Sequence, residues 1–225
     1  MQTRLLTRWK ALVADAPVEA AEAAGRDLLE RYAEPQRRYH DQRHLTEVLD
    51  AVDALAAHAA DLPAVQLAAW FHDAVYQPAA APAQNEEDSA RLAERVLAGL
   101  GVRDRLGDRP GGTVAAVAGL VRGTAHHDVR SDDPSAPRVA DAEVLYDADL
   151  AILAASPQRY AEYVADVRSE YAHVPDEVFR PARAEILRGF VDRPRIYRTP
   201  TAYSAWEAAA RANLAGEVDD LSAGG

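Results

Sequence analysis

The sequence predicts an all-α protein. Apolar residues recur at the three- and four-residue spacing of helices over most of the 225 residues, and the sustained alternation typical of strands is nearly absent. Breaks such as Asp15-Ala16-Pro17 and Gly99-Leu100-Gly101 separate these segments. A chain of this length is sufficient for one domain with a substantial core. We therefore expect a single helical domain over residues 1–218, with its core at about 30–190 and helical extensions at both ends.

Each predicted helix has its own pattern. Pro17 and Pro63 are suited to helix starts, and Ser156-Pro157 marks another. Acidic residues in the segment 85–89 favour the first turn of a helix, where they complement its dipole. The predicted helical ranges are 3–15, 18–33, 44–55, 63–76, 85–100, 113–125, 141–153, 156–171, 175–191 and 201–218. The tail 219–225 is expected to be disordered.

Composition excludes several classes of function. Cysteine is absent, so disulfides, thiolate chemistry and Cys-type metal sites are excluded, and His, Asp and Glu remain as metal ligands. The formal net charge of −11 opposes extended binding to nucleic acid or to an anionic membrane, although a local basic pocket could hold one phosphorylated ligand. No apolar run approaches the length of a membrane span. We expect a cytoplasmic protein, with a homodimer as an open alternative.

The stretch from Leu67 to Tyr76 carries the strongest functional pattern. There an apolar helix runs directly into His72 and Asp73. A buried charged carboxylate is costly unless something pairs with it or binds it, and a divalent ion would do so. Further candidate ligands lie within apolar patterns elsewhere, namely His44 and either Asp147 or Asp149.

This ordered set, a single His, an adjacent His-Asp pair and a distant Asp preceded by Ala, resembles the HD superfamily of metal-dependent phosphohydrolases. The resemblance covers roughly residues 30–215. The stretches that resemble one bacterial family of HD phosphohydrolases are Tyr39-His40-Asp41-Gln42-Arg43-His44, Trp70-Phe71-His72-Asp73-Ala74-Val75-Tyr76, Asn85-Glu86-Glu87-Asp88-Ser89-Ala90, Asp147-Ala148-Asp149-Leu150, Arg168-Ser169-Glu170-Tyr171 and Ala210-Arg211-Ala212-Asn213-Leu214.

The resemblance implies an HD-like helical bundle that holds one divalent ion (Mn, Fe, Mg, Co, Ni or Zn), with a second ion as an alternative. The implied ligands are His44, His72, Asp73 and Asp149. We prefer Asp149 to Asp147 because Ala148 precedes it and Leu150 follows it, as in the family's pattern. Two imidazoles and two carboxylates would leave about two positions of an octahedral shell for water and a substrate oxygen.

Other side chains are candidates for roles around the ion. Besides Asp73, the catalytic candidates are Glu86, at a helix start that could fold back over the ion, and His127, where the family tends to carry Thr-x-x-His. The candidates for substrate binding are His40, Arg168 and Arg183. Glu86 and the two arginines have structural alternatives, because acidic residues favour helix starts and arginines form surface ion pairs, such as one between Arg168 and Glu170.

The expected function is hydrolysis of a phosphate monoester or anhydride of a small, nucleotide-like metabolite. The ion would activate water and polarise a phosphoryl oxygen. Two alternatives remain open. One is a non-catalytic module that senses a nucleotide through the same metal pocket. The other is a di-metal oxygenase on the same scaffold, which would use His126 and His127 as further ligands.

Overall fold

The computed structural model describes residues 1–102, 112–125 and 139–223, and within these ranges the chain forms helices and no strand, which confirms the all-α prediction. Most helices follow the predicted ranges to within a few residues. The α-helices are α1 (Gln2–Leu12), α2 (Val18–Arg31), α3 (Gln42–Ala54), α4 (Leu62–Phe71), α5 (Gln84–Gly99), α6 (Gly112–Gly123), α7 (Val139–Asp149), α8 (Pro157–Glu170), α9 (Asp176–Val191) and α10 (Pro200–Ala223), and the 3₁₀ turns are η1 (Ala56–His58) and η2 (Leu150–Ala154).

Helix α4 lies at the centre of the fold. Its sequence is apolar almost throughout, and every residue from Leu67 to Phe71 is buried. It packs against α1, α3, α5, α6 and α7. Trp9 of α1 contacts the rings of Trp70 and Phe71 edge to face, with centroids 5.4 and 5.9 Å apart. The residues that follow α4 are therefore held inside the molecule rather than at its surface.

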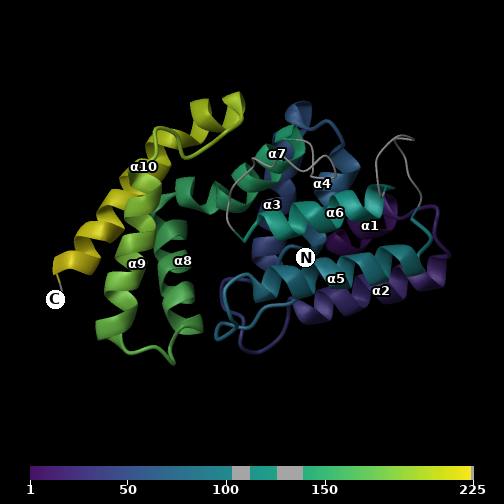
Figure 1. Cartoon of the computed structure of the whole chain (residues 1–225), viewed down its shortest axis with the longest axis horizontal. Helices are drawn as coiled ribbons and strands as arrows, with labels where there is room; N and C mark the ends of the chain where they lie inside the picture. Colours follow the sequence, from purple (N-terminus) through teal and green to yellow (C-terminus); the bar gives the residue numbers. More distant parts are fainter. Residues whose placement is uncertain (103–111, 126–138, 224–225) are drawn as a thin grey trace.

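The last three helices gather at one side of the molecule (Figure 1). Helix α9 packs on α10, and η2, directly after α7, packs on both α8 and α10. One cluster of buried apolar side chains nevertheless extends from Leu5 to Leu214. Within the described residues, no helix has both the length and the apolar character needed to cross a membrane.

Three helix ends differ from the sequence prediction. Helix α4 ends at Phe71 and not near Tyr76, so His72 and Asp73 follow the helix instead of lying on it. The predicted helix over 141–153 changes to a 3₁₀ turn after Asp149.

Helix α10 continues beyond its predicted end near Val218. It reaches Ala223, so residues 219–223 are helical, whereas residues 224–225 lie outside the described part. Arg180 donates hydrogen bonds to the carbonyls of Asp220 (2.6 Å) and Leu221 (2.8 Å). These bonds satisfy carbonyls of the last turns, which explains why the helix does not stop at the polar tail.

Candidate metal centre

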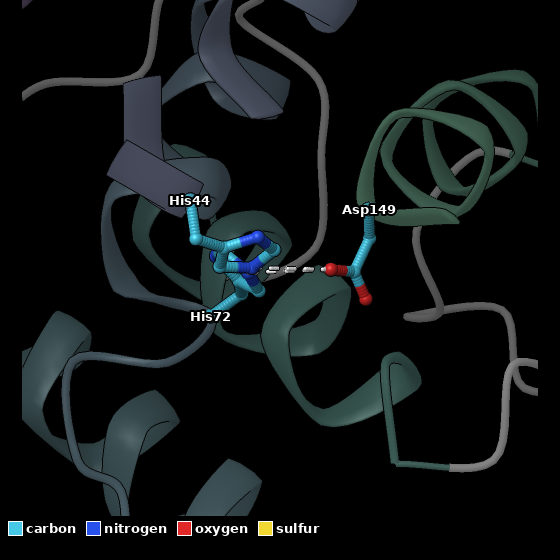
Figure 2. Close-up of side chains that lie close together, drawn as sticks. All are labelled: His44, His72 and Asp149. Carbon is cyan, nitrogen blue, oxygen red and sulfur yellow. Dashed lines mark hydrogen bonds and ion pairs between the residues drawn. The ribbon is translucent and has the colours of Figure 1, made fainter. Parts of the chain in front are cut away.

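Three helix ends bring the predicted ligands together, and Figure 2 shows three of them, His44, His72 and Asp149. His44 lies in the first turn of α3, where the side chain of Asp41 caps the helix by accepting the N–H groups of Arg43 and His44. His72 and Asp73 follow the last residue of α4, and Asp149 is the last residue of α7. Helices α3, α4 and α7 pack against one another, so their ends meet in one place.

The distances within this cluster are short. The Nε2 atoms of His44 and His72 are 3.0 Å apart. Asp73 Oδ2 lies 3.2 and 3.0 Å from these two nitrogens, and Asp149 Oδ1 lies 3.5 Å from both. One ligand atom from each of His44, His72 and Asp149 lies within 4.8 Å of the others. We refer to His44, His72, Asp73 and Asp149 as the His/Asp cluster.

These separations suit a single ion. Ligand atoms about 2.0–2.2 Å from one ion are about 3.0 Å apart at a right angle and about 3.4 Å apart in a tetrahedron. The donor set of two imidazole nitrogens and two carboxylate oxygens matches borderline divalent ions such as Zn²⁺, Fe²⁺ or Mn²⁺. The residues of the cluster therefore fit a divalent metal ion.

The backbone fixes the tautomer of His72. Its Nδ1 lies 2.9 Å from the carbonyl oxygen of Ala69, one turn earlier. A carbonyl oxygen only accepts hydrogen bonds, so Nδ1 carries the proton and, in the neutral ring, Nε2 keeps its lone pair. Nε2 is the nitrogen that faces His44, Asp73 and Asp149. A hydrogen bond of this kind from the distal nitrogen is the usual way in which proteins orient a metal-binding histidine.

The cluster is strongly coupled electrostatically. Burial alone would lower the pKa of His44 and His72, but the nearby carboxylates raise both, and that of His72 lies well above its ordinary value. Burial would raise the pKa of Asp73, yet the charges of His72 and His40 hold it well below its ordinary value. The site therefore favours the carboxylate anion of Asp73 together with positive charge, which protons or a divalent cation can supply.

Arg37 stabilises the backbone next to the cluster. Its side chain is fully buried, and its guanidinium donates to the carbonyl oxygens of Asp73 (2.7 Å), Ala74 (3.3 Å) and His40 (3.0 Å). Arg37 lies in a polar stretch between two predicted helices, and its sequence neighbourhood alone predicts no role for it. A signal was nevertheless present, because this arginine precedes the first ligand helix by only a few residues.

Asp147, the alternative ligand, faces elsewhere. Its Oδ1 accepts the N–H of Arg198 (2.8 Å), and its Oδ2 accepts the N–H and the hydroxyl of Thr199 (both 2.7 Å). Both carboxylate oxygens are thus used to hold the turn before α10. The structure brings Asp149 to the histidines and leaves Asp147 in a structural role, so the preference for Asp149 agrees with the geometry.

The other predicted site residues lie in different surroundings. His40 borders the cluster, with its ring centroid 5.6 Å from that of His44. Glu86 is half-buried in the first turn of α5, and no hydrogen bond or ion pair between described residues joins it to His44 or His72. His127, like His126, lies outside the described residues.

The two candidate arginines are engaged away from the cluster. Arg168 pairs with Asp176 (2.6 Å) and donates to the carbonyls of Tyr171 and Val174, so it does not pair with Glu170 as the sequence suggested. Arg183 pairs with Glu217 (2.9 Å). Neither guanidinium is brought to the His/Asp cluster, because each holds helices or turns of the α8–α10 region together.

Comparison of the chain with family models, with curated proteins and with solved structures yields no match.

Proposed function

We propose that the chain is a metal-dependent phosphohydrolase of the HD type. The observation that carries the proposal is the convergence of two imidazoles and two carboxylates, from three helix ends, at the separations expected around one ion. The order of these residues along the chain, His44, His72-Asp73 and Asp149, is the order that suggested the HD superfamily. The geometry supports a metal site, and the sequence pattern supports the HD-type interpretation of that site.

The residues divide into ligands and supports. His44, His72, Asp73 and Asp149 would hold the ion, while Arg37 and the carbonyl of Ala69 keep Asp73 and His72 in place. A divalent ion held there supplies Lewis acidity towards a phosphoryl oxygen and a water nucleophile at neutral pH. Asp73 and Asp149 are 18% and 17% exposed, so the carboxylate side of the cluster remains open to a small substrate.

The proposed substrate is a small phosphorylated metabolite of nucleotide-like chemistry, cleaved at a phosphate monoester or anhydride bond. The formal net charge of −11 weakens long-range attraction to a polyanion, and this effect increases with the number of phosphates on the ligand. A substrate with one to three phosphates is therefore favoured over a nucleic acid.

A metal-reconstitution screen tests the proposal. The purified chain is stripped with a chelator and reloaded separately with Mn²⁺, Fe²⁺, Mg²⁺, Co²⁺, Ni²⁺ or Zn²⁺, and bound metal is measured per chain. Phosphate release is then followed over nucleoside mono-, di- and triphosphates and sugar phosphates. We expect about one ion per chain and hydrolysis of at least one class. Asp73→Ala should reduce that rate more than about 100-fold, because loss of a residue that only supports a ligand already costs about 10–100-fold.

The outcomes separate the alternatives. An Asp73→Ala variant as active as the parent chain would assign the hydrolysis to another site or to a contaminant. A chain that binds one ion, hydrolyses nothing and is stabilised against heat by a nucleotide would be a sensor module. Two tightly bound irons per chain would favour the oxygenase alternative.

A further inference from the structure

Glu170, the last residue of α8, is a buried carboxylate that holds the turn before α3. Its side chain is fully buried. One oxygen, Oε1, accepts the backbone N–H groups of Arg38, Tyr39 and His40 at 2.8, 2.9 and 3.0 Å. Burial alone would raise the pKa of Glu170, but its hydrogen bonds to His40 and to these backbone groups lower it to about 2. The side chain is therefore an anion under all ordinary conditions.

The second oxygen of Glu170 binds a side chain beside the His/Asp cluster. Oε2 lies 2.7 Å from Nδ1 of His40 and accepts the hydroxyl of Tyr76 at 3.0 Å. A carboxylate anion only accepts hydrogen bonds, so Nδ1 of His40 carries the proton. In the neutral ring the lone pair is then on Nε2, and this nitrogen has no hydrogen-bond partner among the described residues.

The imidazole of His40 is also fixed by packing. It stacks on the ring of Tyr76, with centroids 4.1 Å apart and planes 28° apart, and it meets the ring of Tyr39 edge to face. Arg37 binds the carbonyls of both His40 and Asp73, so one guanidinium ties the turn of His40 to the cluster. The His40 side chain is 20% exposed. It is thus oriented, close to the cluster and reachable from solvent.

Elsewhere in the chain, Glu207 shows what a purely structural carboxylate does. It accepts the backbone N–H groups of Ile196 (3.1 Å) and Tyr197 (3.2 Å), as Glu170 does for residues 38–40. Its Oε1 atom also accepts a hydrogen bond from Arg211, which lies one turn further along α10. Glu170 differs because its Oε2 atom binds the imidazole of His40, which borders the His/Asp cluster, and accepts the hydroxyl of Tyr76.

We propose that Glu170 is a positioning residue that acts through His40, and that Nε2 of His40 is the proton acceptor for hydrolysis at the cluster. The inference rests on the proposed function. When water adds to phosphorus, its proton passes to Nε2 and the P–O bond to the leaving group breaks. The imidazolium formed is stabilised by Glu170 and then gives its proton to the leaving oxygen. The arrangement is the base-plus-orienting-group pair used in other hydrolytic sites.

Glu170→Gln offers a sharp test because an amide cannot replace both carboxylate oxygens. Its oxygen is needed for the three backbone N–H groups, so its NH₂ group must face His40. Nδ1 must then accept, and the proton moves to Nε2. The tautomer is measured by long-range ¹H–¹⁵N correlation on the zinc-loaded full chain at alkaline pH, where free imidazoles are neutral. The signals of His40 are identified by their loss in His40→Gln.

We expect His40 to carry its proton on Nδ1 in the parent chain and on Nε2 in Glu170→Gln. With p-nitrophenyl phosphate and with the best substrate of the screen, kcat of Glu170→Gln should fall about 100-fold, the lower range for loss of a general base, with little change in KM. Zinc content should not change. The matched control Glu207→Gln removes a carboxylate with the same kind of backbone contacts and should alter neither the tautomer nor kcat.

Each contrary result has a distinct meaning. A proton on Nε2 of His40 in the parent chain would overturn the positioning of the ring. A change of tautomer in Glu170→Gln without loss of kcat would leave Glu170 as a structural cap and His40 without a catalytic role. A parent chain that hydrolyses no phosphate ester would defeat the proposed function, and the tautomer would still decide whether Glu170 orients His40.

Discussion

Two acidic regions of the molecule use their carboxylates differently. In the turn before α10, Asp147 and Glu207 bind backbone N–H groups of Ile196, Tyr197, Arg198 and Thr199. In the His/Asp cluster, Asp73 and Asp149 face two imidazole nitrogens, and these nitrogens also face each other. Backbone donors, together with the hydroxyl of Thr199 and the guanidinium of Arg211, account for the first region. The second places four ligand-type atoms around one point, which folding alone does not require.

The largest effect is expected from a matched pair of substitutions on α7. Asp149→Asn should weaken metal binding on the order of 1,000-fold, because losing a ligand lowers metal affinity more than losing a residue that only orients a ligand. Asp147→Asn should leave metal binding unchanged and destabilise the chain by about 2 kcal/mol, because the single amide oxygen can accept the two bonds from Thr199 or the N–H of Arg198 but not all three. Metal affinity is measured by competition with a chromophoric chelator and stability by urea unfolding. Equal metal loss in both variants would remove the distinction between the two regions.

The sequence predicts that both aspartates lie on one helix, but helix physics alone does not tell which of them binds the metal. Residues two apart on a helix point about 200° apart, so only one of Asp147 and Asp149 could face His44 and His72. Both lie within an apolar pattern, and periodicity alone cannot decide which one does. The resemblance to HD proteins favoured Asp149, and the geometry agrees.

Long-range contacts explain what the sequence could not show. Helix periods predicted the elements well because they depend on neighbouring residues. The bonds from Glu170 to residues 38–40 span about 130 positions, and no local pattern indicates them. Arg168 was expected near a substrate, yet it holds the α8–α9 connection, because a guanidinium with five donors can satisfy several carbonyls at once.

The next effect concerns acid stability and Glu170. Its pKa is about 2 in the folded chain, below its ordinary value of 4.5, so it stabilises the fold fully above about pH 4.5 and loses this contribution as the pH falls towards 2. The shift corresponds to about 3 kcal/mol. Urea unfolding from pH 7 to pH 3 should show the difference in stability between the parent chain and Glu170→Gln shrinking on acidification. A constant difference would contradict the role of Glu170 as a buried anion.

A smaller effect is expected for metal binding as a function of pH. In the absence of metal, the raised pKa values of His44 and His72 favour protonated rings near neutral pH. A metal ion must displace the proton of a ring that is protonated in the free chain, so affinity should fall about tenfold for each pH unit of acidification below the pKa of that ring and level off above it. Zinc affinity measured between pH 6 and pH 8 tests this. An affinity independent of pH would mean that the ion binds elsewhere.

The smallest effect is expected at Arg168, which forms a partly exposed ion pair and so differs from both acidic regions. Arg168→Gln removes its pair with Asp176, whose side chain is 70% exposed, and its bonds to the carbonyls of Tyr171 and Val174. Solvent screens such a pair, so we expect a loss of about 1 kcal/mol in urea unfolding and no change in metal affinity or KM. Arg4→Gln, which removes an exposed pair with Asp50, is the matched control. A large rise in KM for Arg168→Gln alone would restore Arg168 as a substrate-binding residue. The α8–α9 connection would then have to move towards the His/Asp cluster when substrate binds.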